Sequence, residues 1–227
     1  MGQKISVNLF RANKRLSNVT NSSGTPNQLQ KSVWYANKTN YSKLLIHDLE
    51  IRKYIKKQLA FAGLVQVVIR RYFRKVEIVL FVTKPGIVIG KSGSSINSLK
   101  ETLVKDFSLP KDIKIEILEF KDPFQSSAVI AFEIAEGLKR SVPFRKLAKT
   151  YIEKIRYSGV LGAKIMIKGR LNGAEIARKE MFSFGSIPRH TIDSNIDYTY
   201  EQAFTKTGVT GVKVWLYKGD KLKNYTY

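Results

Sequence analysis

The fold of the first half of the chain is decided by Val88-Ile89-Gly90-Lys91-Ser92-Gly93-Ser94-Ser95-Ile96. Two glycines flank one basic and one small residue, so the backbone can adopt conformations that other residues rarely reach, and its N–H groups can approach a sugar-phosphate chain closely. Lys91 adds positive charge there, and the N-terminus of the helix that follows adds a favourable dipole. The stretch predicts a tight turn between two helices that binds a phosphate backbone. A joint between helices with no ligand is the alternative.

Apolar periodicity on either side of this turn predicts the elements that surround it. Val and Ile cluster or alternate where strands are expected, and apolar residues recur at three- and four-residue spacing where helices are expected. Asp48 is a good N-cap, and Gly63 is a good helix stop. The predicted elements are a helix from Asp48 to about Gly63 with Leu49, Ile51, Ile55 and Leu59 on its apolar side, strands over 64–71 and 76–82, a short apolar segment over 87–89, a helix with Ile96, Leu99 and Leu103 on one side, and a strand over 113–117.

In this setting Gly90, Lys91, Ser92 and Gly93 resemble the GXXG loop of K-homology RNA-binding domains, and the order of the flanking elements resembles the second topological type of that domain. The resemblance implies that these four residues bind RNA. The segment 86–92 also nearly matches the nucleotide-binding P-loop, but it has three residues between its glycines where that loop needs four. The spacing therefore disfavours nucleotide hydrolysis, and no enzyme activity is expected.

The chain carries an excess of positive charge that favours a polyanionic partner. Its 227 residues include 40 Lys and Arg against 18 Asp and Glu, a formal net charge of +22, and 43% of them are hydrophobic. Because such a surplus repels itself in a compact chain, the balance indicates counter-charge from nucleic acid or from an anionic membrane. The chain has no cysteine, which excludes disulfides, thiolate metal sites and cysteine nucleophiles.

Few residues are suited to a metal site or to catalysis. The two histidines, His47 and His190, are too few for a multi-ligand metal site, and both are expected to be structural. Asp193 and Asp197 stand four residues apart, but we expect them to serve turns or to pair with nearby Arg and Lys. The sequence therefore predicts no metal, no cofactor and no catalytic residue.

Proline and charge interrupt the periodicity at 121–123, where a second domain is expected to begin. Helices are predicted over 126–140 and from Pro143 to about Ser158, with strands over 163–167 and 212–216 and, between these, a basic turn over 169–178 that leads into a short helix. The fold class is therefore α+β. The expected organisation is an extended basic N-terminal arm over 1–45, a type II K-homology RNA-binding domain over 46–120, a C-terminal α/β domain over 124–219 and a tail over 220–227.

The helix that follows Pro143 is expected to be cationic on its outer side. Its core stripe is predicted to consist of Phe144, Leu147, Tyr151 and Ile155. Arg145, Lys149 and Arg156 stand at offsets of four and seven residues, with Lys146 beside them, so several positive charges share one exposed face. Solvated charge is the ordinary interpretation of such a face, but the net charge of the chain favours contact with phosphates.

Further blocks of sequence resemble one family. These blocks are Met1-Gly2-Gln3-Lys4, 85–91, Gly169-Arg170-Leu171, 173–178 and Gly211-Val212-Lys213-Val214-Trp215. From about Tyr41 to Lys218 the chain is similar to the bacterial-type S-three family of small-subunit ribosomal proteins. The resemblance implies a C-terminal α/β ribosomal domain, a place in the head of the small subunit against ribosomal RNA, and a share in lining the channel through which messenger RNA enters.

The resemblance also implies roles for particular residues. Arg145, Lys146 and Lys149 are expected to grip messenger RNA and to help open its secondary structure. Further basic candidates for RNA binding are Lys4, Arg156, Lys168, Arg170 and Arg178. The expected partners are small-subunit ribosomal RNA, messenger RNA and neighbouring proteins of the head, with no membrane.

Composition suggests an origin for the chain. Its 28 Lys against 12 Arg, with 22 Ile and 11 Asn, resemble usage in AT-rich genomes, and residues 41–52 resemble mitochondrially encoded members of the family. With no import presequence at the N-terminus, we favour a ribosome of the mitochondrial matrix, with the bacterial cytoplasm as the alternative. The N-terminal arm departs from the family, since Ile5-Ser6 follows Lys4 where the family usually has His-Pro or Asn-Pro.

Two alternatives to a ribosomal role remain open. A standalone K-homology regulator would share the GXXG loop but would have little use for the Gly169-Arg170-Leu171 and Trp215 blocks. A myristoylated peripheral membrane protein would use Gly2 and Ser6, which formally satisfy the short acylation pattern, together with the basic surface.

Overall fold

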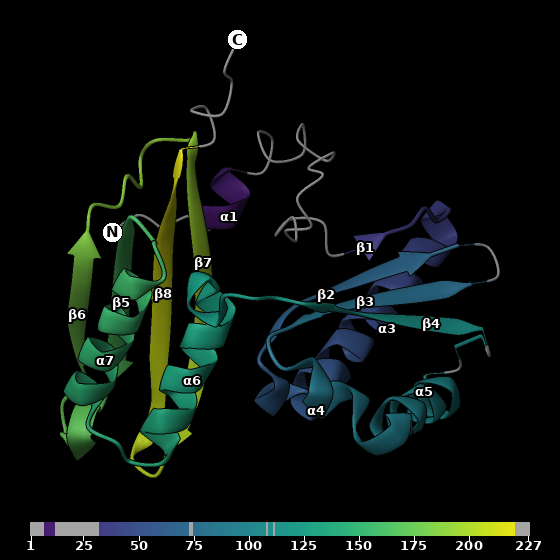
Figure 1. The fold of residues 1–227 in the computed structure, drawn as a ribbon, viewed down its shortest axis with the longest axis horizontal. Coiled ribbons are helices and arrows are strands. Elements are labelled where there is room, and N and C mark those ends of the chain that lie inside the picture. The colour runs from purple at the N-terminus through teal and green to yellow at the C-terminus, as the bar shows by residue number, and fades with distance from the viewer. Residues whose placement is uncertain (1–6, 12–31, 73–74, 108, 111, 221–227) are drawn as a thin grey trace. The chain divides into compact units, whose positions relative to one another are not determined.

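The computed structural model describes residues 7–11, 32–72, 75–107, 109–110 and 112–220 of the chain (Figure 1). Its described residues fall into two units. One lies within residues 24–121, and the other combines the C-terminal part, from residue 122 onward, with residues 7–11 near the N-terminus. Each unit contains helices and a β-sheet, which confirms the predicted α+β class.

The unit within residues 24–121 has helices on a four-stranded sheet. The strand order is β1-β2-β3-β4, formed by Ser32–Val33, Leu64–Arg71, Val76–Val82 and Ile113–Glu119. β2 and β3 are antiparallel, whereas β1 and β4 run parallel to their neighbours. The helices are α3 (Lys38–Gln58), α4 (Pro85–Ile89) and α5 (Ser94–Asp106), with 3-10 turns at Ala60–Ala62 and Lys91–Gly93.

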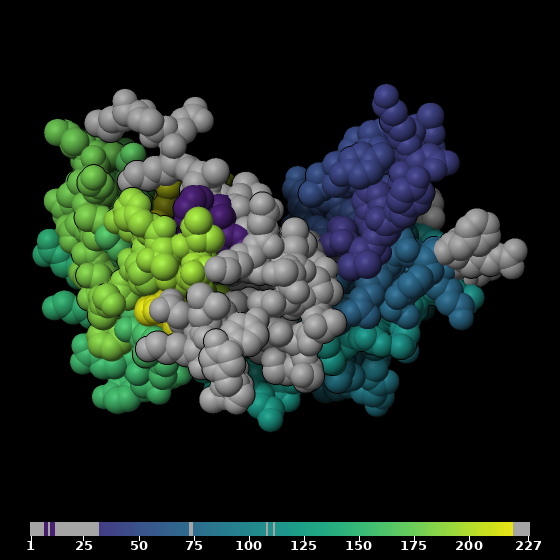
Figure 2. All heavy atoms as spheres, turned by 90° about the horizontal axis from the view of Figure 1, so that it is seen from above, coloured from purple at the N-terminus to yellow at the C-terminus, as the bar shows by residue number. Residues whose placement is uncertain are grey.

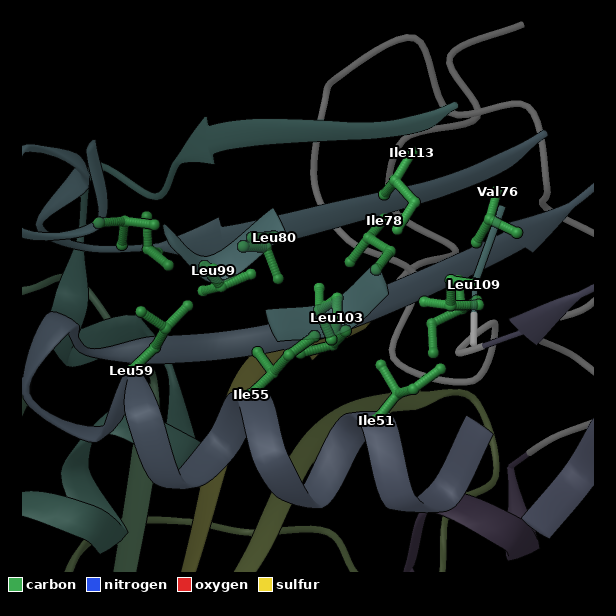
Figure 3. Packing of buried hydrophobic residues seen from close by; sticks show 14 of the residues in the cluster. Ile51, Ile55, Leu59, Val76, Ile78, Leu80, Leu99, Leu103, Leu109 and Ile113 are labelled. Carbon is green, nitrogen blue, oxygen red and sulfur yellow. The ribbon is translucent and has the colours of Figure 1, made fainter. Parts of the chain in front are cut away.

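Apolar side chains of α3 and α5 pack together against one face of this sheet. Ile51 and Ile55 of α3 point toward the sheet and share one core with Leu80 of β3 and Leu103 of α5, and all four side chains are fully buried (Figure 3). Burying each contributes roughly 1.5–3 kcal/mol. Leu49, predicted to share this apolar side, is instead 57% exposed. It lies two residues before Ile51, which places it on nearly the opposite side of the helix.

The helix α3 begins at Lys38, so Asp48 lies inside it and is not the predicted N-cap. Its side chain is 1% exposed. One carboxylate oxygen accepts a hydrogen bond from Nε of Arg71 at 2.8 Å, and the other accepts from Nε1 of Trp34 at 2.8 Å and Oγ of Ser32 at 3.2 Å. The buried carboxylate therefore fastens β1 and β2 to α3.

The segment 32–45, predicted to belong to an extended arm, contains β1 and the first two turns of α3. β1 pairs with the edge of β2, with Ser32 opposite Ile69 and Val33 opposite Arg70. The sheet consequently has a fourth strand beside the three that the sequence predicted. Residues 12–31 lie outside the described part of the chain.

The second unit has helices and an antiparallel sheet. The strand order is β6-β5-β8-β7, formed by Arg178–Gly185, Gly162–Gly169, Gly208–Asp220 and Ser194–Thr205. The helices are α6 (Ser127–Lys139), α7 (Phe144–Tyr157) and the short α1 (Val7–Phe10), with 3-10 turns at Pro123–Gln125 and Leu171–Gly173.

The helices α6 and α7 cover the same face of this sheet (Figure 1). Ile134 of α6 and Phe144 of α7 share a core with Ile165 of β5 and Val214 of β8. Because successive strand residues point to opposite faces, the residues between these core positions point away from the two helices.

Asp197 of β7 caps α6 from the sheet. Its carboxylate accepts hydrogen bonds from the backbone N–H of Ser127 at 3.0 Å and from Oγ of Ser127 at 2.6 Å. Nζ of Lys218 lies 3.8 Å from the same carboxylate. The expected structural role of Asp197, including an ion pair with a lysine, is confirmed.

The prediction of a short helix after the basic turn was wrong. Residues 174–177 form no helix, and β6 begins at Arg178. β5 and β6 pair along their whole length, from Gly162 opposite Gly185 to Gly169 opposite Arg178. Pairing with β5 therefore determines the extended conformation of β6.

The short helix α1 attaches to this unit through Arg11, the residue that follows it. The side chain is 2% exposed and donates hydrogen bonds to the carbonyl oxygens of Ser194, Thr191 and Arg189 at 3.0, 2.8 and 3.0 Å. Figure 2 shows α1, in purple, against the yellow-green residues around the start of β7. Burial lowers the pKa of the Arg11 guanidinium. Residues 7–11 of the predicted arm are thus part of the second unit.

Candidate RNA-binding surfaces

The Gly-Lys-Ser-Gly loop forms a tight turn between α4 and α5. Gly90, Ser92 and Gly93 all have positive φ values, of 71, 51 and 77°. A Cβ on Gly90 would lie 2.2 Å from Oγ of Ser95, so the turn has no room for a side chain at Gly90. Lys91 and Ser92 are exposed. The predicted turn between two helices is confirmed, and it brings a lysine together with the N-terminus of α5.

The same loop is unsuited to the P-loop alternative. Residues Pro85–Ile89 form the helix α4. The backbone N–H of Gly90, which follows this helix, donates to the carbonyl oxygen of Gly86. A nucleotide-binding loop instead directs successive N–H groups at the phosphates. The segment before Lys91 therefore lacks the open loop that nucleotide hydrolysis needs.

The outer side of α7 presents the predicted cationic residues to solvent. Arg145, Lys146, Lys149 and Arg156 are all exposed, whereas Phe144 is buried. Among the described residues, no ion pair engages Lys146 or Lys149. Both ammonium groups are therefore available to an external anion.

Arg145 and Arg178 converge on Glu180 of β6, a residue that the sequence did not single out. An Nη atom of Arg145 lies 3.2 Å from Oε1 of Glu180, and Nε of Arg178 lies 3.5 Å from the same oxygen. Both arginine side chains are more than half exposed. Because a carboxylate between two guanidinium groups offsets part of their charge, Glu180 competes with any phosphate that binds them.

The remaining basic candidates lie in different places. Arg156 stacks over the ring of Phe184, with its guanidinium carbon 4.6 Å from the ring centroid. Nε of Arg170 donates to the carbonyl oxygen of Ala174 at 2.9 Å and so holds the turn before β6. Lys168 is exposed on the sheet face away from α6 and α7. Lys4 lies outside the described residues.

Tyr151 of α7 was predicted to belong to the core stripe, and it packs partly buried against the core. Burial and the neighbouring Glu133 carboxylate raise the pKa of Tyr151 to about 12. Nζ of Lys154 lies 5.2 Å from the centroid of its ring and 5.3 Å from that of Phe124. Lys154 is thus a further cation of α7, beside the 3-10 turn that precedes α6.

The histidine prediction is confirmed for His47, whose two ring nitrogens contact the carbonyl oxygen of Phe107 at 2.7 Å and an Nη atom of Arg71 at 3.1 Å. His190 is exposed. Over the described ranges, no group of three or more His, Cys, Asp or Glu residues is placed to hold a metal ion. None of the described helices is long and apolar enough to cross a membrane.

Two family models match the chain, one for each unit. A KH domain model matches residues 50–125, and a model of the C-terminal domain of ribosomal protein S3 matches residues 134–216. The order of the two matches is the predicted order of the domains.

Curated relatives match across both units. The chain is 41% identical over 191 residues to small ribosomal subunit protein uS3 of Polynucleobacter asymbioticus, which covers 84% of this chain and 69% of that protein. It is 41% identical over 189 residues to the uS3 protein of Desulforamulus reducens, covering 83% and 85%. It is 39% identical over 191 residues to the uS3 protein of Chlamydia trachomatis, covering 84% of each. By these matches, the chain belongs to the uS3 family of ribosomal proteins.

Proposed function

We propose that this chain is a structural, non-enzymatic constituent of the small ribosomal subunit, located in its head, where it binds ribosomal RNA and neighbouring proteins. Membership of the uS3 family is the observation that carries the proposal. The net charge of +22 supports it, since the self-repulsion of such a charge is relieved by an anionic partner. A standalone K-homology regulator is disfavoured by the S3-type C-terminal domain over 134–216.

The GXXG loop is the proposed RNA-binding site of the first unit. Its positive φ values at Gly90 and Gly93 keep side chains away from one side of the backbone, and Lys91 is exposed beside it. A ribose-phosphate chain could approach N–H groups at the start of α5, where the helix dipole favours negative charge.

The proposed extent of the K-homology domain remains 46–120, and that of the ribosomal domain remains 124–219.

The α7 face of Arg145, Lys146 and Lys149 is the proposed grip on messenger RNA in the channel through which the message enters. One arginine and two ammonium groups project from this helix, and the described residues form no ion pair with either ammonium group. Lys4, Arg156, Lys168, Arg170 and Arg178 are proposed as further contacts with RNA. Since these contacts are electrostatic, each lost one should reduce the salt dependence of RNA binding, measured as the slope of log K against log salt, by about one.

The test is to replace Arg145, Lys146 and Lys149 together by alanine and to measure translation of matched messages with and without a stable hairpin. We expect the hairpin message to be impaired more strongly. The matched control replaces Lys53, Lys56 and Lys57 of α3 by alanine, which removes the same charge from another helix. Equal impairment of both messages by the α7 variant would contradict a role in opening message structure.

A ribosome of the mitochondrial matrix is the proposed location, with the bacterial cytoplasm as the alternative. The excess of Lys, Ile and Asn supports an AT-rich genome, while the uS3 relatives from Polynucleobacter, Desulforamulus and Chlamydia are bacterial. The DNA that flanks the coding sequence decides the matter. A coding sequence on a main bacterial chromosome would exclude the mitochondrial proposal.

A further inference from the structure

The sheet of the second unit has a face that neither α6 nor α7 covers. Register places Lys164, Met166 and Lys168 of β5 on it, beside Lys179 and Met181 of β6, Tyr198 and Tyr200 of β7, and Lys213 and Trp215 of β8. One end of this face is closed, since Trp215 is only 8% exposed and packs against Tyr198 with ring centroids 5.3 Å apart. The other end is open, with Tyr200 44% and Met181 53% exposed.

The open end, which we call the Tyr200 face, is formed by Lys168, Lys179, Met181, Tyr200 and Lys213. None of the cross-strand partners of these five residues in the described sheet is Asp or Glu. Glu180, Asp197 and Glu201 stand at positions of the opposite parity, and the remaining carboxylate residue, Asp220, is the last residue of β8, where it pairs with Ser194 at the other end of the sheet. The Tyr200 face is therefore positively charged without internal compensation, unlike the neighbourhood of Arg145.

Tyr200 is held in a defined position on this face. A Cβ on Gly211 would lie 3.1 Å from Cε2 of Tyr200, so the ring lies against the backbone of β8 at a residue without a side chain. Nε2 of Gln202 donates to the Tyr200 hydroxyl at 3.2 Å, and Nζ of Lys213 lies 5.7 Å from the ring centroid. An exposed ring fixed in this way and bordered by lysines has the features of a base-stacking surface.

We propose that the Tyr200 face is a second RNA-binding surface, on which an unpaired base stacks on Tyr200 while the adjoining phosphates contact Lys168, Lys179 and Lys213. The inference rests on the proposed function in one respect, namely that the chain binds RNA. Charge complementarity favours RNA over a protein partner, because three ammonium groups that form no ion pair among the described residues match a polyanion. A base stacked on tyrosine needs no particular sequence, since every base has a π-face.

The first test measures the affinity of the full chain for a single-stranded oligouridylate of about ten nucleotides and for an RNA duplex of equal length. Tyr200→Ala should weaken single-strand binding by about 5- to 150-fold, whereas Tyr200→Phe should retain it. Tyr35→Ala is the matched control, because Tyr35 is 89% exposed in the other unit. Unchanged single-strand affinity in Tyr200→Ala, or an equal loss for the duplex, would overturn base stacking on this face.

The second test places a photoreactive phenylalanine analogue at position 200 in assembled small subunits. Cross-linking to RNA supports the proposal, and cross-linking to another protein overturns it and assigns the face to a protein neighbour. The Arg145→Ala, Lys146→Ala and Lys149→Ala triple variant separates the two proposals. Failure of the Tyr200 variants alone removes only the Tyr200 face, whereas failure of the triple variant alone removes only the α7 grip.

Discussion

Asp48 in one unit and Arg11 in the other are both almost fully buried, yet they are held in different ways. The carboxylate of Asp48 has a partner of opposite charge, Arg71, and two further donors. The hydrogen bonds that the described residues provide to Arg11 all end on backbone carbonyl oxygens. Near Arg11, Asn8 Oδ1 and Ser194 Oγ are buried without a hydrogen-bond partner in the described part of the chain.

The difference indicates how firmly each N-terminal segment is attached. In the first unit, β1 is attached through Ser32 to the Asp48 carboxylate, which is ion-paired with Arg71 of β2. In the second unit, a network of neutral acceptors holds α1. Breaking a buried ion pair leaves an uncompensated charge, which costs more than losing hydrogen bonds to neutral groups. We therefore expect the attachment of β1 to be the stronger of the two, and each attachment to be local to its own unit.

The largest effect is expected for Arg71→Ala, which leaves the Asp48 carboxylate buried without its ion pair. Such a loss costs about 3–5 kcal/mol. Hydrogen exchange of the amides of β2 should report a lower free energy of opening by this amount, with the second unit unaffected. Arg70→Ala is the control, because the Arg70 side chain is 44% exposed and an Nη atom lies as far as 3.9 Å from Oε2 of Glu77. Such an exposed ion pair contributes about 0–1 kcal/mol to stability. Equal effects of the two variants would contradict the importance of the buried pair.

A smaller effect is expected for Arg11→Ala, which leaves carbonyl oxygens of residues 189–194 without their donor. Unsatisfied buried acceptors cost about 1–3 kcal/mol. The amides of the start of β7 should exchange faster, while those of β2 stay protected. Arg189→Ala removes a neighbouring exposed arginine and serves as the control. Faster exchange in both units would show that α1 is not a local attachment.

Trp34→Phe should have a still smaller effect, because it removes one donor to Asp48 and leaves Arg71 in place. A hydrogen bond to a charged group contributes about 1.5–3 kcal/mol, and we expect the lower end because Arg71 and Ser32 still donate to the carboxylate. Exchange of α3 amides near Asp48 measures the loss. A loss as large as that of Arg71→Ala would mean that the tryptophan stabilises the Asp48 carboxylate as much as the ion pair does.

The smallest change in stability is expected for a charge at the surface. Glu180→Gln should alter the unfolding free energy by less than about 1 kcal/mol, since its arginine partners are largely exposed. The same variant should strengthen RNA binding and steepen its salt dependence, because Arg145 and Arg178 lose their carboxylate. A fluorescence titration with RNA at several salt concentrations measures both. Weaker binding would contradict competition between Glu180 and phosphate.

Much of the fold could be predicted because its elements have clear local patterns. β2 and β3 have the predicted bounds, since Val and Ile dominate them and turns flank them. α7 begins directly after Pro143 and ends before Gly159 for equally local reasons. The two glycines of the GXXG loop identified the turn between α4 and α5.

The parts that the sequence did not predict depend on partners far along the chain. The first turns of α3 expose Tyr41, Leu45 and Ile46, so they have no buried stripe for periodicity to detect. Arg11 is bonded to residues more than 170 positions away. Likewise, Glu180 and the Tyr200 ring gain their surroundings only when β6, β7 and β8 pair. Such groups could be located only in the folded chain.

The central claim, that the chain is an RNA-dependent part of the small ribosomal subunit, is tested most directly by sucrose-gradient sedimentation of a lysate before and after RNase treatment. We expect the chain to sediment with small subunits and to leave those fractions when the RNA is digested. Sedimentation near its own mass of 25.9 kDa without any digestion would contradict the claim.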